Sequence, residues 1–292
     1  MRRSPVLILS LVLVSFAYGQ SGVKVELDDV TDNRVSAGPF VGSLDLRVKL
    51  NGSNLDKATA ARIVVKDARD DQGNTLINPK ADPPDFAPRE YNSGTLQLNV
   101  RQPARNASSV KIKGTVELYV PSRDPSAIVK VDKALAKLDA PLSSKTLKSA
   151  KIEITPLSRA KYMETLKSRK LDDKAIEEIR ARGKKEGVPE KDIELAIEMA
   201  KAFDSMDSEP PENAVLLSAK KSDFDRIFRI EILGKNGEPV NMPSRSTSSR
   251  GDASLMTLQP SEAVPADATL ELFVLTDKSR VSFPFELNVP LP

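Results

Sequence analysis

The sequence predicts a mainly β protein in which two antiparallel β-sandwich domains flank a central helical insertion. Apolar residues recur at every second position over many short segments near both ends, as in strands with one buried face. Between these regions their spacing changes to that of an amphipathic helix. The expected organisation comprises a signal peptide, an N-terminal sandwich, a helical segment and a C-terminal sandwich, at residues 1–19, 22–155, 156–207 and 214–292.

Residues 1–19 have the three parts of a secretory signal peptide. Arg2 and Arg3 form a positive start, and an uncharged, mostly apolar run extends from Val6 to Ala17. Ala17 and Gly19 place small residues where a signal peptidase cuts. A membrane-spanning helix needs about 20 apolar residues, so a cleaved signal is expected rather than an anchor. The mature chain, in which no later stretch could cross a membrane, is predicted to be periplasmic or secreted.

The segment 22–155 contains a series of short predicted strands. Residues 44–50 alternate between apolar and charged side chains, and residues 96–100 repeat this pattern. Residues 110–120 predict one longer strand or two, with Gly114 at a bend or bulge. Because helices do not alternate with these strands, a parallel α/β sheet is not expected.

The segment 156–207 predicts three helices. Ser158 can cap the first and Asp172 the second, while Gly187 and Pro189 are suited to the end of one helix and the start of the next. The third helix has one apolar stripe, formed by Ile193, Ala196, Ile197, Ala200 and Phe203.

The segment 214–292 returns to strand patterns. A strand is predicted from Phe224 to Ile232, followed by a turn at Asn236-Gly237. Two closing strands, residues 270–274 and 281–289, are expected on either side of Asp277-Lys278.

The two β regions share a weak sequence similarity, in which matching segments occur in the same order along the chain. Chance similarity between two alternating sequences and a true duplication are both compatible with it. The matching pairs are 62–65 with 229–232, 102–103 with 259–260, and 117–120 with 271–274. The layout resembles that of secreted bacterial proteins with immunoglobulin-like sandwiches, which implies two immunoglobulin-like domains but carries over no functional residue.

The composition excludes several chemistries. The chain has no His, Cys or Trp, so a Ser-His-Asp triad, a thiol nucleophile, a disulfide framework and an ordinary zinc site are impossible. Lys and Arg number 44 against 41 Asp and Glu. Without Arg2 and Arg3, the mature chain has 42 basic and 41 acidic residues. This balance gives no indication of a nucleic-acid partner.

The remaining catalytic and metal-binding patterns are weak. Four Ser-x-x-Lys pairs occur where about 2.5 are expected by chance, and they begin at Ser21, Ser108, Ser158 and Ser218. Adjacent acids on a strand point to opposite faces, so they do not form a glycosidase pair. The clusters Asp67–Asn74 and Asp28–Asp32 could in principle bind calcium, but solvated turns are the expected interpretation. We therefore predict no catalytic, metal or cofactor site.

One basic segment is a candidate anion site. Residues 244–251 are rich in Ser and Thr, and Arg245 and Arg250 could bind an anion there. A flexible hairpin loop without a ligand is the simpler expectation.

These exclusions predict an exported, non-catalytic binding or scaffolding protein of the cell envelope or the extracellular space, with an unknown protein or glycan partner in the envelope. A hydrolase using carboxylates or a Ser-Lys pair is the first alternative. An envelope chaperone or assembly factor, with the helices as its partner-binding element, is the second.

Overall fold

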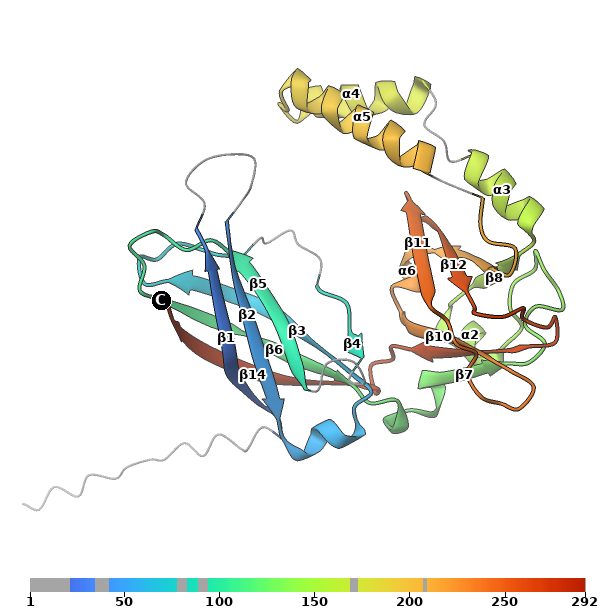
Figure 1. Cartoon of the computed structure of the whole chain (residues 1–292), viewed down its shortest axis with the longest axis horizontal. Coiled ribbons are helices and arrows are strands. Elements are labelled where there is room, and N and C mark those ends of the chain that lie inside the picture. Colours follow the sequence, from blue (N-terminus) through green and yellow to red (C-terminus); the bar gives the residue numbers. More distant parts are fainter. Residues whose placement is uncertain are drawn as a thin grey trace, which may run out of the picture. The chain divides into compact units, whose positions relative to one another are not determined.

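The computed structural model describes residues 22–34, 42–77, 83–88, 94–168, 173–206 and 209–291. This part of the chain is mainly β with four antiparallel sheets, as predicted (Figure 1). The chain divides into two compact units, residues 1–120 with 280–292 (unit 1) and residues 121–279 (unit 2). The predicted signal peptide lies outside the described residues.

Unit 1 contains two sheets, with strand orders β1-β2-β5 and β14-β6-β3-β4. One hydrophobic core contains buried side chains of both sheets, among them Leu44 and Leu98 from the first and Ile112 and Val289 from the second. The strands are β1 (Lys24–Asn33), β2 (Ser43–Asn51), β3 (Ala60–Asp70), β4 (Ala87–Pro88), β5 (Thr95–Arg101), β6 (Ser109–Tyr119) and β14 (Arg280–Pro290). A 3₁₀ helix, η1 (Ser53–Lys57), connects β2 to β3.

Unit 2 also contains two sheets, with strand orders β10-β13-β7 and β11-β12-β9-β8. Its core again contains residues of both sheets, including Ile232 and Leu270 from the first and Leu217 and Leu258 from the second. The strands are β7 (Ile128–Val131), β8 (Ile154–Leu157), β9 (Val215–Lys220), β10 (Ile227–Leu233), β11 (Ser244–Arg250), β12 (Ala253–Gln259) and β13 (Thr269–Val274).

The short helices α2 (Lys145–Ala150) and α6 (Lys221–Phe224) contribute Leu147 and Phe224 to this core, whereas the three longer helices of unit 2 lie outside it. In a separate cluster Tyr162 and Leu166 of α3 (Arg159–Ser168) pack on Leu216 and Leu255, so α3 covers the second face of the four-stranded sheet. Helices α4 (Asp173–Lys185) and α5 (Glu190–Met206) form a hairpin with its own small apolar contact (Figure 1). Unit 2 also contains the 3₁₀ turns η2 (Pro121–Arg123) and η3 (Pro125–Ala127).

Both units repeat one arrangement of strands. In unit 1, β2 lies between β1 and β5, and β6 lies between β3 and β14. In unit 2, β9 lies between β8 and β12, and β13 lies between β10 and β7. The similar segments 62–65 and 117–120 lie on the neighbouring elements β3 and β6. Their counterparts, 229–232 and 271–274, lie on the neighbouring strands β10 and β13. The similar sequence segments therefore lie on strands that have equivalent positions in the two units.

Unit 2 is one continuous segment of the chain, whereas unit 1 is completed by β14 after unit 2 ends. β7 follows β6 in sequence but pairs with β13, while β14 follows β13 but pairs with β6. Unit 2 is thus inserted in sequence between β6 and β14 of unit 1. The predicted ranges 22–155 and 214–292 differ from these units because residues 121–155 belong to unit 2 and residues 280–292 to unit 1. The predicted closing strands 270–274 and 281–289 lie in different sheets.

Several local predictions are confirmed, and one bulge is displaced. The main chain of Lys161 donates to Ser158 Oγ at 3.2 Å as α3 begins, and Gly187 has φ +72° between α4 and α5. Gly114 lies within a single continuous β6. The irregularity occurs on the neighbouring β3, where Val65 pairs with Gly114. A Cβ at Gly114 would lie 2.4 Å from Val64 O, so the close approach of β3 requires glycine.

Asp124 connects the segment that follows β6 to the segment that follows β13. Its Oδ1 accepts hydrogen bonds from the Ser126 amide at 2.9 Å and the Ser126 hydroxyl at 2.7 Å. Its Oδ2 accepts from Thr276 Oγ1 at 2.6 Å. The hydrogen bonds from Thr276 and Ser126 lower the pKa of Asp124 from 3.8 to about 2. The carboxylate therefore binds both connections inside unit 2.

Asp124→Ala is expected to lower the free energy of unfolding of unit 2 by about 1–3 kcal/mol at neutral pH, because it removes a cap and charge-assisted bonds. A carboxylate with a lowered pKa stabilises the fold above its unfolded pKa and loses this contribution as pH falls through its folded value. The difference between the wild type and the variant should thus shrink from pH 3.8 to about 2. Urea unfolding at several pH values measures it, and a difference that stays constant across this range would contradict the assignment.

Candidate functional site

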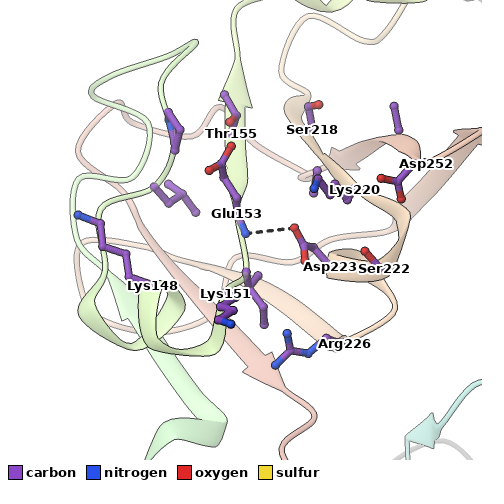
Figure 2. A pocket seen from close by; sticks show the side chains of 15 residues that line it. Lys148, Lys151, Glu153, Thr155, Ser218, Lys220, Ser222, Asp223, Arg226 and Asp252 are labelled. Carbon is purple, nitrogen blue, oxygen red and sulfur yellow. Dashed lines mark hydrogen bonds between the residues drawn. The ribbon is translucent and has the colours of Figure 1, made fainter.

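One cleft in the described part of unit 2 has a volume of about 1030 Å³. Figure 2 shows it between the segment that carries Lys151 to Thr155 and the segment that carries Ser218 to Asp223. It is lined by both signs of charge and by three hydroxyl groups. The polar lining residues are Lys148, Lys151, Glu153, Thr155, Ser218, Lys220, Ser222, Asp223, Arg226 and Asp252.

Two polar contacts join the walls of the cleft. The buried Asp223 on α6 accepts a hydrogen bond from the main-chain N–H of Glu153 at 3.2 Å (Figure 2). Arg226 Nη1 donates to the main-chain oxygen of Ala150 at 2.7 Å. Ala150 is the last residue of α2, whose C-terminal carbonyls carry partial negative charge. Both contacts therefore fix the segment after α2 against the segment around α6.

The cleft presents Lys148, Lys151 and Lys220 together with the exposed carboxylates of Glu153 and Asp252 and the buried carboxylate of Asp223. Such a lining can bind a polar ligand that carries charge. A Ser-Lys mechanism would require a hydroxyl within hydrogen-bond reach of its lysine, whereas a carboxylate mechanism would require two carboxyl groups on either side of one ligand. None of the hydroxyls of Thr155, Ser218 and Ser222 forms a hydrogen bond with a lysine or carboxylate of the cleft.

The Ser-x-x-Lys pairs have local structural partners in the described residues. Ser108 Oγ donates to Asp71 Oδ2 at 2.6 Å. Ser158 caps α3, and Lys161 Nζ pairs with Glu164 at 2.9 Å. Lys221 Nζ pairs with Asp225 at 3.0 Å, and Ser21 lies outside the described residues.

The acidic turns use their carboxylates within the fold. Asp70 accepts from the main-chain N–H groups of Gln72, Asn74 and Ala104. The side-chain and main-chain hydrogen bonds from Ser108 lower the pKa of Asp71. Among the described residues no group of three or more Asp and Glu side chains could hold a metal ion.

The predicted loop that carries Arg245 and Arg250 is a regular strand, β11. It pairs residue by residue with β12, from Ser244 opposite Gln259 to Arg250 opposite Ala253. Side chains five positions apart on a strand point to opposite faces. Arg245 Nη1 donates to Phe228 O on β10 at 3.5 Å, on the side of the other sheet. The structure thus does not bring the two guanidinium groups together around one anion.

The α4–α5 hairpin carries a surface that the predicted stripe does not include. Ile193 and Ile197 of the predicted stripe are buried against Ile176 of α4. Ala196 of the stripe is exposed, and the side chain of Phe203 lies outside the described residues. Leu195 and Met199, one turn apart on the opposite side of α5, are each 53% exposed. The sequence does contain a signal for this surface, because Leu195 and Met199 are two apolar residues at i and i+4 outside the main stripe.

The sequence analysis also did not predict the cleft, because its residues come from three separated stretches of the chain and match no motif.

No helix in the described residues is long and apolar enough to cross a membrane. No protein-family model matches the chain, and neither a curated protein nor a solved structure shows significant similarity to it.

Proposed function

We propose that this chain is an exported, non-catalytic binding or scaffolding protein of the cell envelope or the extracellular space. In this proposal residues 1–19 act as the signal peptide, and each unit is an immunoglobulin-like β-sandwich with a core between its two sheets. The repeated strand order and the cores shared by both sheets support the sandwich assignment. The α4–α5 hairpin serves as an element that binds a protein partner.

The exposed face of α5 carries this proposal. Leu195 and Met199 present large apolar side chains to solvent, and Val188, just before the helix, is 37% exposed. Water contact with a contiguous apolar face is unfavourable, and a partner that covers it gains about 25 cal/mol per Å² of buried apolar surface. The opposite face of α5 is already held by α4 through Ile193, Ile197 and the pair Arg180 Nε to Glu194 Oε1 at 2.7 Å. The hairpin can therefore keep its shape while its outer face binds.

A pair of matched variants tests the proposal. Leu195→Gln with Met199→Gln should leave the helix content by circular dichroism unchanged, because glutamine is a good helix former. The same change should reduce capture of the envelope partner by the immobilised mature protein about 10-fold or more, since each buried anchor contributes more than about 1 kcal/mol.

The control is Ala181→Gln with Lys185→Gln, two exposed positions one turn apart on α4. These changes should leave capture unaffected. Equal capture by both variants, or the absence of any specifically captured protein, would refute the hairpin as the binding element.

A further inference from the structure

We propose that the outer edge of β11 binds an extended, acidic peptide segment by adding it as a fifth strand to the sheet β11-β12-β9-β8. This proposal goes beyond the hairpin surface and does not depend on it, because it arises from a different element. β11 has no counterpart in unit 1, where the sheet that contains β1, β2 and β5 ends at β5. All seven residues of β11 are at least partly accessible, and six of them are exposed.

The turn between β11 and β12 determines which main-chain groups point outward. Gly251 has φ +60° and Asp252 completes a two-residue turn, which makes Arg250 and Ala253 its closing pair. The closing pair of such a hairpin exchanges hydrogen bonds, and bonded and non-bonded pairs then alternate along the ladder. Thr247 and Ser249 consequently direct their N–H and C=O groups to the outer edge.

Several other outer strands in the described sheets have features that hinder the addition of a strand, and β7 has only four residues. β8 is four residues long and includes Pro156, and β14 includes Pro284. β1 and β10 are interrupted by bulges, and β4 has two residues. Exposed edges are normally protected by short length, proline, bulges or charge. β11 is seven residues long and has a regular register, no proline and no lysine. The outer strand β5 shares these features, but three of its seven residues are buried, whereas β11 has none that is buried.

The charge around β11 favours an acidic occupant. β11 itself carries Arg245 and Arg250 and no acidic residue, and the nearest acidic residues in sequence are Glu238 and the turn residue Asp252. The two arginines lie five positions apart and on opposite faces, on either side of the uncharged stretch Ser246–Ser249. An added strand with acidic residues five positions apart would place one carboxylate beside each arginine, on the matching face. Self-pairing of two copies would instead bring two basic strands together.

Fluorescence anisotropy with labelled, capped six-residue peptides tests the proposal. The probe alternates threonine and valine between a glutamate at each end, and its matched control has a lysine at each end. The full mature chain should bind the glutamate peptide at least about 10-fold more tightly than the lysine peptide. Thr247→Pro removes an outward N–H without removing a bond to β12, so it should abolish binding while β11 stays paired. Arg245→Ala with Arg250→Ala should weaken binding about 10-fold.

Each outcome decides the proposal. Loss of binding in Thr247→Pro with unchanged thermal unfolding supports strand addition. Binding that survives Thr247→Pro but requires the arginines would show only loose charge attraction and overturn it. No binding, or equal binding of both peptides, would also overturn it. Sedimentation of the free chain distinguishes the rival occupant, because a dimer that Thr247→Pro dissociates would assign the edge to a second copy of this chain.

Discussion

Removal of residues 280–292 is expected to unfold unit 1 and to leave unit 2 folded. β14 pairs with β6 over its whole length, from Arg280 opposite Tyr119 to Pro290 opposite Ser109. Its Leu287 and Val289 are buried in the core of unit 1. Burial of each such side chain contributes about 1.5–3 kcal/mol, and the truncation also removes a full ladder of hydrogen bonds. The combined loss, about 5 kcal/mol or more, is comparable to the total stability of a typical domain.

Hydrogen exchange measured peptide by peptide distinguishes the two units. Segments of β2 and β6 should lose protection in the truncated chain, while segments of β9 and β13 keep it. A synthetic peptide of residues 280–291, added in excess, should restore protection to unit 1. Loss of protection in unit 2 instead would support a continuous C-terminal domain over 214–292 and contradict the assignment of β14 to unit 1.

Point variants separate loss of β14 packing from loss of the chain end itself. Val289→Asp places a charge at a fully buried position and should destabilise unit 1 strongly. Asn288→Asp makes the same kind of change at the neighbouring exposed position and should cost less than about 0.5 kcal/mol.

Asp70→Ala is expected to lower the free energy of unfolding of unit 1 by about 2–4 kcal/mol, because several donors would lose one buried acceptor. Asp70 is 5% exposed at the end of β3. Its carboxylate accepts from the N–H groups of Asn74 at 2.8 Å and Ala104 at 3.0 Å, and it also binds the Asn74 side chain at 2.9 Å. Ala104 follows β5, so one side chain joins the turn after β3 to a distant loop.

The pKa of Asp70 supports a pH-dependent effect. Desolvation raises it, but the hydrogen bonds from Ala104, Asn74 and Gln72 outweigh burial and leave it below its usual value. The stabilisation is therefore present above the unfolded pKa and is lost as pH falls through the folded one. The cost of Asp70→Ala, measured by denaturant unfolding, should decrease in acid.

Asp67→Ala is the matched control for this variant. Asp67 lies on the same strand, and its exposed side chain pairs with Arg69 at 3.2 Å. An exposed ion pair contributes about 0–1 kcal/mol. If Asp67→Ala and Asp70→Ala cost the same, Asp70 does not have the structural role that its hydrogen bonds indicate.

Much of the local structure could be read from the residue pattern. The alternation over 44–50 produces β2, and the alternation over 281–289 produces β14, because each strand buries one face. Ser158 and Gly187 marked helix boundaries through capping chemistry that needs only neighbouring residues. The segment 244–251 was misread as a loop because its serines and arginines lack apolar alternation. It forms a strand through pairing with β12.

The candidate sites depended more on the tertiary structure. The cleft combines Lys151, Ser218 and Arg226, which lie far apart in the sequence and carry no common motif. The outer face of α5 was visible as Leu195 and Met199, but only the position of α4 shows which apolar face stays uncovered.

The sequence alone determined the β-rich class, the central helices and the absence of imidazole and thiol chemistry, because these follow from composition and from patterns within about ten residues. The tertiary structure alone decided the partners of the strands. The alternation in β7 and β14 specifies a buried face but no neighbouring strand. Which strand each one pairs with depends on contacts between residues more than a hundred positions apart, such as Val289 with Val110 and Leu270 with Val131.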